Sequence, residues 1–341
     1  MAYDMGSMPR TSLAAVRSLA RTPARMYLVS GSFAYDTVLH HPQAFRQRIL
    51  PEVIDKLNVS FDVAAVGEAF GGCAGNIAYS AALLGDEPML VGNLGADGDR
   101  YLQRLQHLGL DTTTLGVIPV LPTAHAWMLT DATGNQIISF HSGAMSAPVR
   151  LPYAPPALWH IAPEDPVNML TLARAARASG VEYFFDPGQC LPVLLEGAGE
   201  HVESLLPVLQ DATGIFLNDY EFELLAARYD IRRLLTKPEQ FIVRTRGSAG
   251  VELLHEGRAC TMPVAEAEAV VDPTGCGDAF RAGFLHAYTR GRSLHACVGL
   301  GAVMGALAVG AHGGQGHHAT AEEVYARART YNRTATIEYM D

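Results

Sequence analysis

The sequence is poor in lysine and in positive charge. Its 341 residues include 25 Lys or Arg against 35 Asp or Glu, a formal net charge of −10, and the only lysines are Lys56 and Lys237. Because a phosphate backbone is bound by clustered positive charge, this balance argues against nucleic acid as a partner. Neither lysine lies in a Gly-x₄-Gly-Lys-Ser/Thr motif, so a P-loop is excluded.

Paired cysteine motifs and long apolar runs are also missing. The cysteines are scattered, odd in number and never spaced as Cys-x-x-Cys: Cys73, Cys190, Cys260, Cys276 and Cys297. This usage argues against a disulfide framework and a zinc knuckle, and it predicts a protein of the reducing cytoplasm. No run of about 18 apolar residues occurs, so we expect no membrane span.

Residues 1–25 differ in composition from the rest of the chain. They contain four arginines against a single acid, Asp4, together with several Ser, Thr and Ala residues. Such a stretch resembles a targeting peptide, but it lacks the apolar run of a secretory signal. We predict that residues 1–25 form a disordered extension and that residues 26–341 form one domain.

From Met26 onward, short apolar runs alternate with amphipathic segments, which is typical of a sheet covered by helices. An apolar content of 49% and a mean hydropathy of +0.10 supply a large core. The expected strands are Tyr27–Ser30, Met89–Val91, Val181–Phe185, Ile215–Leu217, Phe241–Thr245 and Val251–Leu254. The expected helices are Ile77–Leu84, Arg100–Leu108, Val167–Ala178, Val202–Gln210 and Glu221–Tyr229. The crossovers predict an α/β fold with a mostly parallel sheet.

Two segments depart from this alternation. Phe33–Phe70 is rich in aromatic and β-branched residues, and Thr123–Phe140 has two strand-like runs around a hairpin signal at residues 131–135. We predict that residues 33–70 and 123–140 form a small sheet, a lid, over the main one.

The glycine-bracketed turn at residues 272–278 carries the most specific chemistry. Gly275, Cys276 and Gly277 lead into an apolar helical pattern whose first turn holds Asp278. The first amides of a helix have no intrahelical partner and lie at the positive end of its dipole, so they favour an anion such as a transferring phosphoryl group. The alternative is an Asp cap after a flexible loop.

A second glycine cluster, Gly71-Gly72, precedes the expected helix at Ile77. Glycine amides and the Asn76 side chain can hold sugar hydroxyls, since an amide offers both a donor and an acceptor. Asp36, beyond the first strand, can accept both hydrogen bonds of a vicinal diol. The alternatives are a tight turn for the glycines and a turn cap for Asp36.

Two further motifs follow expected strands. Asn218 and Glu221 have the spacing of a capping box, and Glu221 is alternatively placed to hold Mg²⁺ through a water. Thr245, Gly247 and Gly250 form either an ordinary hairpin turn or a loop that approaches a nucleotide.

Taken together, these motifs resemble the ribokinase-like family of carbohydrate and nucleoside kinases, also called the PfkB family, from about Met26 to Gly316. The resemblance implies a Rossmann-like three-layer sandwich with a small β-sheet lid. It also implies that Asp278 is the base on the accepting hydroxyl, with the amides of residues 275–277 as the anion hole.

The resemblance assigns the remaining motifs as well. ATP would lie near Thr245–Gly250, with Asn218 and Glu221 serving Mg²⁺ and phosphate. The acceptor would be held by Asp36, Gly71, Gly72 and Asn76. Asp272 and Thr274 match positions that help to hold a monovalent cation, K⁺, in several relatives.

The acceptor is predicted from the lid. Aromatic residues in Phe33–Phe70 favour the adenosine-kinase-like branch, because they can stack on a purine, or they simply fill the lid's apolar seam. We therefore expect phosphorylation of the 5′-hydroxyl of a nucleoside, adenosine first, by a monomer or a homodimer through the lid. Cys276 and Arg281 depart from the pattern of the usual adenosine kinases.

Three alternatives remain from the sequence. The first is a sugar kinase acting on ribose, fructose or a keto-deoxy sugar acid. The second is a non-catalytic nucleoside or sugar sensor, against which the intact Asp278 and Glu221 argue. The third is a dehydrogenase, which is the weakest because no Gly-x-Gly-x-x-Gly follows the first strand.

Overall fold

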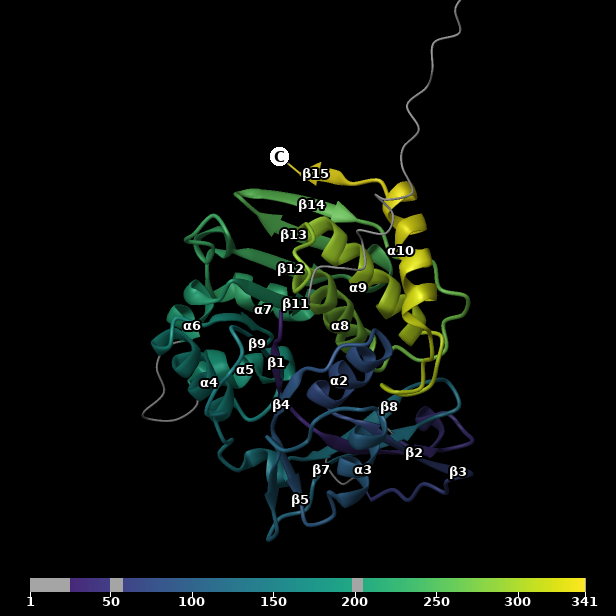
Figure 1. The fold of residues 1–341 in the computed structure, drawn as a ribbon. Coiled ribbons are helices and arrows are strands. Elements are labelled where there is room, and N and C mark those ends of the chain that lie inside the picture. Colours follow the sequence, from purple (N-terminus) through teal and green to yellow (C-terminus); the bar gives the residue numbers. More distant parts are fainter. Residues whose placement is uncertain (1–24, 50–57, 198–204, 341) are drawn as a thin grey trace, which may run out of the picture.

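The main sheet of the protein is a long, mostly parallel one. The structure, a computed structural model, describes residues 25–49, 58–197 and 205–340. Within these residues the sheet has the order β15-β14-β13-β12-β11-β10-β9-β1-β4 (Figure 1). The strands from β4 to β12 run parallel, and β13, β14 and β15 are added antiparallel. Their bounds are β1 Leu28–Ser30, β4 Met89–Val91, β9 Leu158–Ile161, β10 Glu182–Phe185, β11 Gly214–Asn218, β12 Phe241–Thr245, β13 Val251–His255, β14 Arg258–Met262 and β15 Glu338–Met340.

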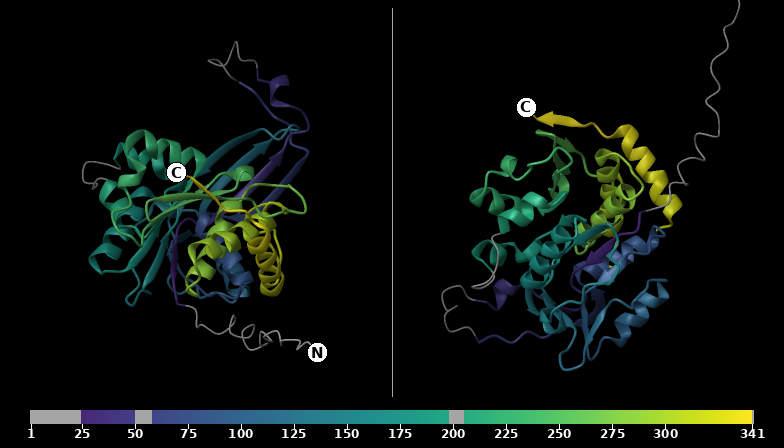
Figure 2. Two further views of the ribbon diagram at one scale, coloured as in Figure 1. Left: turned by 90° about the horizontal axis from the view of Figure 1, so that it is seen from above. Right: turned by 60° about the vertical axis from the view of Figure 1, so that its left-hand side comes forward.

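Helices cover both faces of this sheet and produce two separate cores. One core holds residues of α2, α8, α9 and α10, and the other holds residues of α4, α5, α6 and α7. The two groups of helices lie on opposite sides of the sheet in both views of Figure 2. Their bounds are α2 Cys73–Leu83, α4 Pro166–Ala178, α5 Leu191–Glu196, α6 Leu205–Asp211, α7 Asp219–Arg228, α8 Cys276–Tyr288, α9 Leu294–Ala308 and α10 Ala321–Thr334. The predicted α/β sandwich is confirmed.

The lid is a second sheet of order β3-β2-β7-β8, at the bottom of Figure 1. It comprises β2 (Ala34–His40), β3 (Ala65–Gly71), β7 (Ala124–Thr130) and β8 (Gln136–His141). The turn between β7 and β8 is closed by the Asp131 side chain, which accepts from the backbone amides of Thr133 and Asn135. Nearby lie α3 (Asp99–His107) and a short pair, β5 (Asn93–Gly95) and β6 (Gly116–Ile118).

The sequence predicts most strands of the parallel sheet, and the differences from the prediction include the following three. Helix α2 begins at Cys73, earlier than the expected Ile77, so Asn76 lies in its first turn and not in a preceding loop. Asp36 lies within β2, not in a loop at the edge of the main sheet. Strand β9 was not predicted, since a run of only four residues containing His160 carries no clear period.

Some predictions fall on residues outside the described part of the chain. These are residues 1–24 of the expected extension, residues 50–57 of the lid segment and residues 202–204 of an expected helix. Arg25, the last residue of the expected extension, is described, and its guanidinium forms an ion pair with Glu182 at 2.6 Å.

Candidate active site

A cavity of about 760 Å³ opens at the carboxyl ends of the parallel strands. Open α/β sheets bind their ligands at this edge. Asp186, Asn218 and Thr245 reach the cavity from the ends of β10, β11 and β12, and the first turns of α8 close it. Its other walls are mainly apolar and come from residues 264–270 and from α9: Val264, Ala265, Val270, Ala302, Ala306 and Val309. The cavity therefore combines a polar end at α8 with an apolar end suited to a flat aromatic group.

The polar end is formed by the amino terminus of α8. Gly275 caps the helix in the left-handed region at φ 75°, and a β-carbon there would lie 2.5 Å from the Gly314 Cα. The Cys276 amide donates to the Pro273 carbonyl at 3.2 Å. In the described part of the chain, the amides of Gly277 and Asp278 donate to no acceptor, and both residues line the cavity. Of the predicted set, the Cys276 amide is engaged and Gly275 does not line the cavity, so the free amides at the cavity are those of Gly277 and Asp278.

The Asp278 carboxylate lines the cavity at this helix terminus and accepts a hydrogen bond from Asn76 Nδ2 at 2.8 Å. Burial raises the pKa of Asp278 to about 6, while the Asn76 amide and the Arg281 charge act in the opposite direction. A carboxylate with this pKa is ionised at neutral pH and can still accept a proton late in a reaction.

Asn76 connects the cavity to the lid. The Gln315 side chain donates to Asn76 Oδ1 at 3.4 Å and to the Tyr101 hydroxyl at 3.0 Å. Tyr101 in turn donates to the carbonyl of Gly71 at 2.7 Å. Gln315 and Tyr101 were missed from the sequence, because their only signal is a contact between segments far apart in the chain.

Asp36 lies on the lid beside the end of β3. Its carboxylate lies where a β-carbon at Gly71 would project, so a side chain there would displace the Asp36 carboxylate. The residue is 9% exposed, and burial followed by the charge of Asp272 raises the pKa of Asp36 to about 6. Gly72, at φ 85°, caps α2, so the expected acceptor residues Asp36, Gly71, Gly72 and Asn76 lie at one junction of lid and core.

The Asn218–Glu221 pair forms the capping box that the sequence allows. Asn218 Oδ1 accepts from the Glu221 amide, and both Glu221 carboxylate oxygens accept from Asn218, each at 2.8 Å. The same residues line the cavity, so the cap and a role at the ligand are compatible. Burial, followed by the charge of Asp186, raises the pKa of Glu221 to about 7.

The Thr245–Gly250 segment is a tight connection between β12 and β13. It contains a short 3₁₀ helix over Gly247–Ala249, and Gly247 and Gly250 have φ values of 52° and 91°. Thr245, Gly247 and Gly250 all line the cavity beside its apolar end. The segment is therefore both a turn between antiparallel strands and a wall of the cavity.

Asp272 and Thr274 do not line this cavity. The Asp272 carboxylate accepts from the amides of Thr274 and Gly313, each at 2.9 Å, and fixes the loop that precedes α8. Partial burial alone would raise the pKa of Asp272, but these hydrogen bonds lower it.

Most lid aromatics pack among themselves. Phe33 is fully buried, and Phe33, Tyr35 and Phe70 each pack against Tyr101 with ring centroids 5.1 to 5.8 Å apart. These rings fill the apolar seam, which was the alternative to stacking on a ligand.

The lid face that carries Asp36 presents other apolar groups. Cross-strand partners share a face of a sheet, and Asp36 pairs with Ala126, which pairs with Phe140. Phe140 is 50% exposed, and its neighbour on the same face, Ile138, is 57% exposed. Ala69, the partner of Asp36 on β3, lies beside Gly313, so this face is turned toward the loops around α8.

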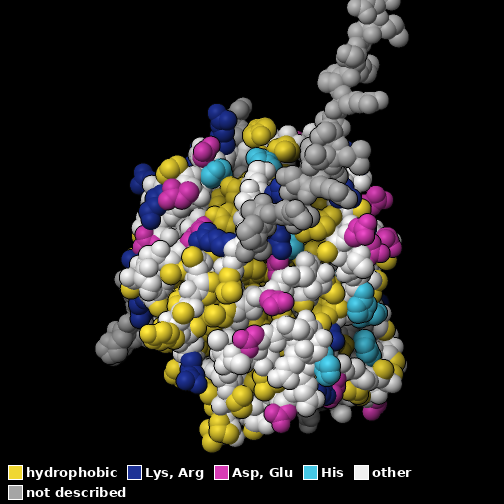
Figure 3. Space-filling view, viewed as in Figure 1, with side chains coloured by type: hydrophobic (Ala, Val, Ile, Leu, Met, Phe, Trp, Pro, Cys, Tyr) yellow, Lys and Arg dark blue, Asp and Glu magenta, His cyan; other side chains and the backbone are white. Residues whose placement is uncertain are grey.

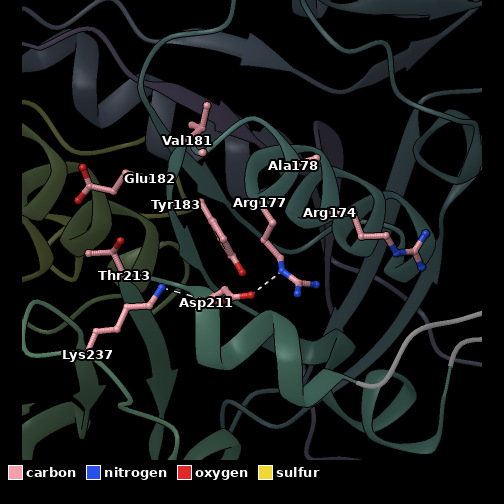
Figure 4. Close-up of a pocket in the computed structure, with 10 residues that line it drawn as sticks. Arg174, Arg177, Ala178, Val181, Glu182, Tyr183, Asp211, Thr213 and Lys237 are labelled. Carbon is pink, nitrogen blue, oxygen red and sulfur yellow. Dashed lines mark ion pairs between the residues drawn. The ribbon is translucent and has the colours of Figure 1, made fainter.

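A second cavity, of about 690 Å³, lies at the opposite edge of the sheet, where strands β10, β11 and β12 begin (Figure 4). The side chains of Arg177 and Lys237 turn toward Asp211 there, at 2.6 and 3.7 Å. None of the predicted site residues lines this cavity.

The surface and the described residues give three further observations. On the face seen in Figure 3, Lys and Arg side chains are scattered and form no continuous stripe. Among the described helices, none combines the length and the apolar character required to cross a bilayer. The described residues also contain no cluster of three or more His, Cys, Asp or Glu residues that could hold a metal ion.

Known proteins are similar to this chain in both sequence and fold. Residues 34–321 match the family described as pfkB family carbohydrate kinase. A nucleoside kinase of Methanocaldococcus jannaschii is 32% identical over 276 residues, which are 79% of this chain and 89% of that protein.

Solved structures of a Burkholderia thailandensis nucleoside kinase are similar as well. The complex with inosine has a TM-score of 0.77 at 35% identity and covers 89% of this chain and 97% of that one. The complex with ADP and inosine has a TM-score of 0.75 at 35% identity, with coverages of 89% and 95%. The fold is thus ribokinase-like. The chain belongs to the pfkB family of carbohydrate kinases, and it is a phosphotransferase that uses ATP.

Proposed function

We propose that the protein transfers the γ-phosphoryl group of ATP to the 5′-hydroxyl of a nucleoside. The observation that carries this proposal is the position of Asp278: it lies at the free amino terminus of α8, in the cavity, and is hydrogen-bonded to Asn76 at the root of the lid. One carboxylate thus links a helix terminus suited to a phosphoryl group with the lid residues that we propose for the acceptor.

The reaction is a direct displacement. The 5′-oxygen forms a bond to the γ-phosphorus as the bond from that phosphorus to the β,γ-bridging oxygen breaks, and ADP leaves. The hydroxyl proton passes to the Asp278 carboxylate. Because the transition state is loose, a weak base that accepts the proton late is sufficient, and most of the catalysis comes from alignment and charge neutralisation. The Gly277 and Asp278 amides would donate hydrogen bonds to the oxygens of the transferring phosphoryl group.

Magnesium fits the polar end of the cavity. Glu221 and Asp186 are buried carboxyl residues there, and a triphosphate would add further negative charge. We propose that Glu221, positioned by Asn218, holds a Mg²⁺ ion through water. When bound, the ion neutralises charge on the phosphates.

The lid supports a nucleoside over a free sugar. Asp36 is available to a vicinal diol, and Phe140 and Ile138 continue the same face with exposed apolar surface. A free pentose has no group to cover that surface, whereas a planar base does. The relative of B. thailandensis was solved with inosine, which agrees with this choice.

The test is ADP release from ATP and Mg²⁺ in the presence of adenosine, inosine, guanosine, cytidine, ribose, fructose or a keto-deoxy sugar acid. We expect turnover with nucleosides, and adenosine stays the first choice from the sequence. Turnover with free sugars alone would replace the nucleoside by the sugar-kinase alternative and leave the phosphotransferase assignment intact. Binding of nucleosides without ADP release would support the sensor alternative.

The remaining predictions concern the surroundings of the reaction. Activation by K⁺ through Asp272 and Thr274 is tested by replacing K⁺ with tetramethylammonium in the assay. Light scattering measures the oligomeric state and so decides between a monomer and a homodimer through the lid. A single domain over residues 26–341 predicts one cooperative unfolding transition, and location in the cytoplasm rests on the cysteine usage and is tested by cell fractionation.

A further inference from the structure

Arg281 is the only Lys or Arg among the described residues that line the active-site cavity. It lies on α8, one turn beyond Gly277, and is 6% exposed. Its Nε donates to Asp186 Oδ2 at 2.7 Å, its Nη2 to Asp186 Oδ1 at 3.3 Å, and its Nη1 to the Gly277 carbonyl at 3.2 Å. A buried, two-point ion pair thus ties the first turns of α8 to the end of β10.

The ion pair lies next to the catalytic carboxylate. The groups that act on Asp278 are Asn76 and Cys73 from α2, Cys276 and Arg281 from its own helix, and Asp186 from the end of β10. Burial raises the pKa of both thiols, so they are neutral in the range of a kinase assay, and the Asn76 amide carries no charge. Arg281 and Asp186, which line the same cavity, are therefore the two charged groups that act on Asp278.

We propose that Arg281 and Asp186 form a positioning pair for phosphoryl transfer: the pair holds the free amide of Gly277 at the cavity and sets the balance of charge next to Asp278. The role in phosphoryl transfer rests on the proposed function, but the effect of the pair on the ionisation of Asp278 is a property of the free protein. Neither residue has to touch the nucleoside or ATP for the pair to act.

The two partners act on the base in opposite senses. Arg281 favours the ionised form of Asp278, and Asp186 disfavours it, because like charges repel. Loss of Arg281 therefore raises the pKa of Asp278, and loss of Asp186 frees the guanidinium charge and lowers it. A group that only supported the fold would not give shifts of opposite sign.

The experiment measures the acidic limb of kcat/KM against pH for the wild type, Arg281→Gln, Asp186→Asn and the double variant. An opposite charge at close range shifts a carboxyl pKa by about one unit or more. We expect the limb to move up by about one pH unit in R281Q and down in D186N, and to return toward the wild-type position in the double variant, where a neutral amide pair replaces the ion pair. Arg281→Lys should restore most of the limb, because the charge is kept, but less of the rate, because the two-point geometry is lost.

Two outcomes overturn the proposal. In the first, the acidic limb of kcat/KM stays at the wild-type pH in both single variants. In the second, it moves in the same direction in both. Should a single variant fail to fold, as shown by thermal unfolding, R281K and the double variant still give the comparison. The pKa of Asp278, measured by carbon-13 NMR with Asp278→Asn for assignment, gives the same test without turnover. A wild type that phosphorylates no nucleoside would therefore end the proposed function while the effect of the pair on Asp278 remains measurable.

Discussion

The two halves of the active site are built differently. In the half that we propose for ATP, the free amides, the proposed base Asp278 and the arginine come from one continuous segment, residues 277–281, at the start of α8. In the acceptor half, Asp36, Asn76 and Phe140 come from separate elements, β2, α2 and β8. A local motif thus supplies the groups proposed for the chemistry, whereas the residues proposed for the acceptor come together only when the lid strands pair.

This difference explains why one half was easier to predict. A helix terminus that binds an anion depends on backbone amides and glycine conformation, which a short sequence reveals. A pocket for a base depends on which face of a strand is turned toward the site, and a shift of one residue would turn Phe140 to the other face. Variants in each half therefore test whether the two can be separated.

The largest effect is expected at Asp278, where the halves meet. Asp278→Asn removes the proton acceptor but keeps a side chain of the same shape, so kcat should fall by about 10² to 10⁴-fold with little change in KM for ATP. Steady-state kinetics measure this. Asp99→Asn, which changes another Asp in the first turn of a helix, α3, is the matched control. Near-normal turnover of D278N would remove Asp278 from the role of base.

The next effect is expected at Asp36, in the acceptor half alone. Asp36→Asn replaces a charged acceptor by an amide, and a hydrogen bond to a charged group contributes roughly 1.5 to 3 kcal/mol, so KM for the nucleoside should rise about 10- to 100-fold. KM for ATP should stay within about twofold, because Asp36 does not line the ATP cavity. Initial rates with each substrate varied in turn measure both constants. An equal rise in both would mean that the halves are not separable.

The same variant has a predicted stability that depends on pH. The pKa of Asp36 is raised to about 6 in the folded protein, so the native carboxyl binds its proton more tightly than the unfolded one, and stability falls as pH rises from about 4 to 6. D36N avoids this loss and should be more stable than the wild type by on the order of 2 kcal/mol at about pH 8, with no gain at about pH 4. Urea unfolding at both values measures it. A gain of equal size at both would point to a cause other than the carboxyl charge.

The opposite effect on the two KM values is expected at Ala306 on α9, in the half that we propose for ATP. Ala306 lines the apolar end of the cavity, and Ala306→Leu places extra bulk there. Overpacking typically costs about 1 to 3 kcal/mol, so KM for ATP should rise about tenfold while KM for the nucleoside is unchanged. Substrate-dependence assays give both values. Leu307→Ala, at the next position of the same helix but outside the cavity lining, provides a comparison. An unchanged KM for ATP would place the adenine elsewhere.

The smallest effect is expected at Phe140 on the lid. Phe140→Ala removes exposed apolar surface on the Asp36 face, and loss of an aromatic contact of about 0.5 to 1.5 kcal/mol predicts a rise in nucleoside KM of about three- to tenfold. Any activity with free ribose should not change, since ribose has no base. Tyr153→Ala, a fully exposed aromatic outside the lid strands, is the control. A loss shared by ribose would indicate that the lid itself is disturbed.

The sequence determined the parallel sheet and the helix start that we propose for the ATP half of the site. The strands Met89–Val91 and Phe241–Thr245 lie where the apolar runs predict them, because the residues of a strand that are buried on both faces of the sheet are apolar. Gly275 and Asp278 were likewise visible, since a left-handed glycine and an acid at a helix start are local requirements. These features depend on neighbours along the chain.

Only the tertiary structure decided the rest. It placed Asn76 inside α2, engaged the Cys276 amide with Pro273 and left the amides of Gly277 and Asp278 free. It also paired Arg281 with Asp186, 95 residues away, and turned Phe140 to the face of Asp36. These outcomes depend on which distant segments pack together, and no local pattern records such contacts, because their free energy appears only once water has been excluded between them.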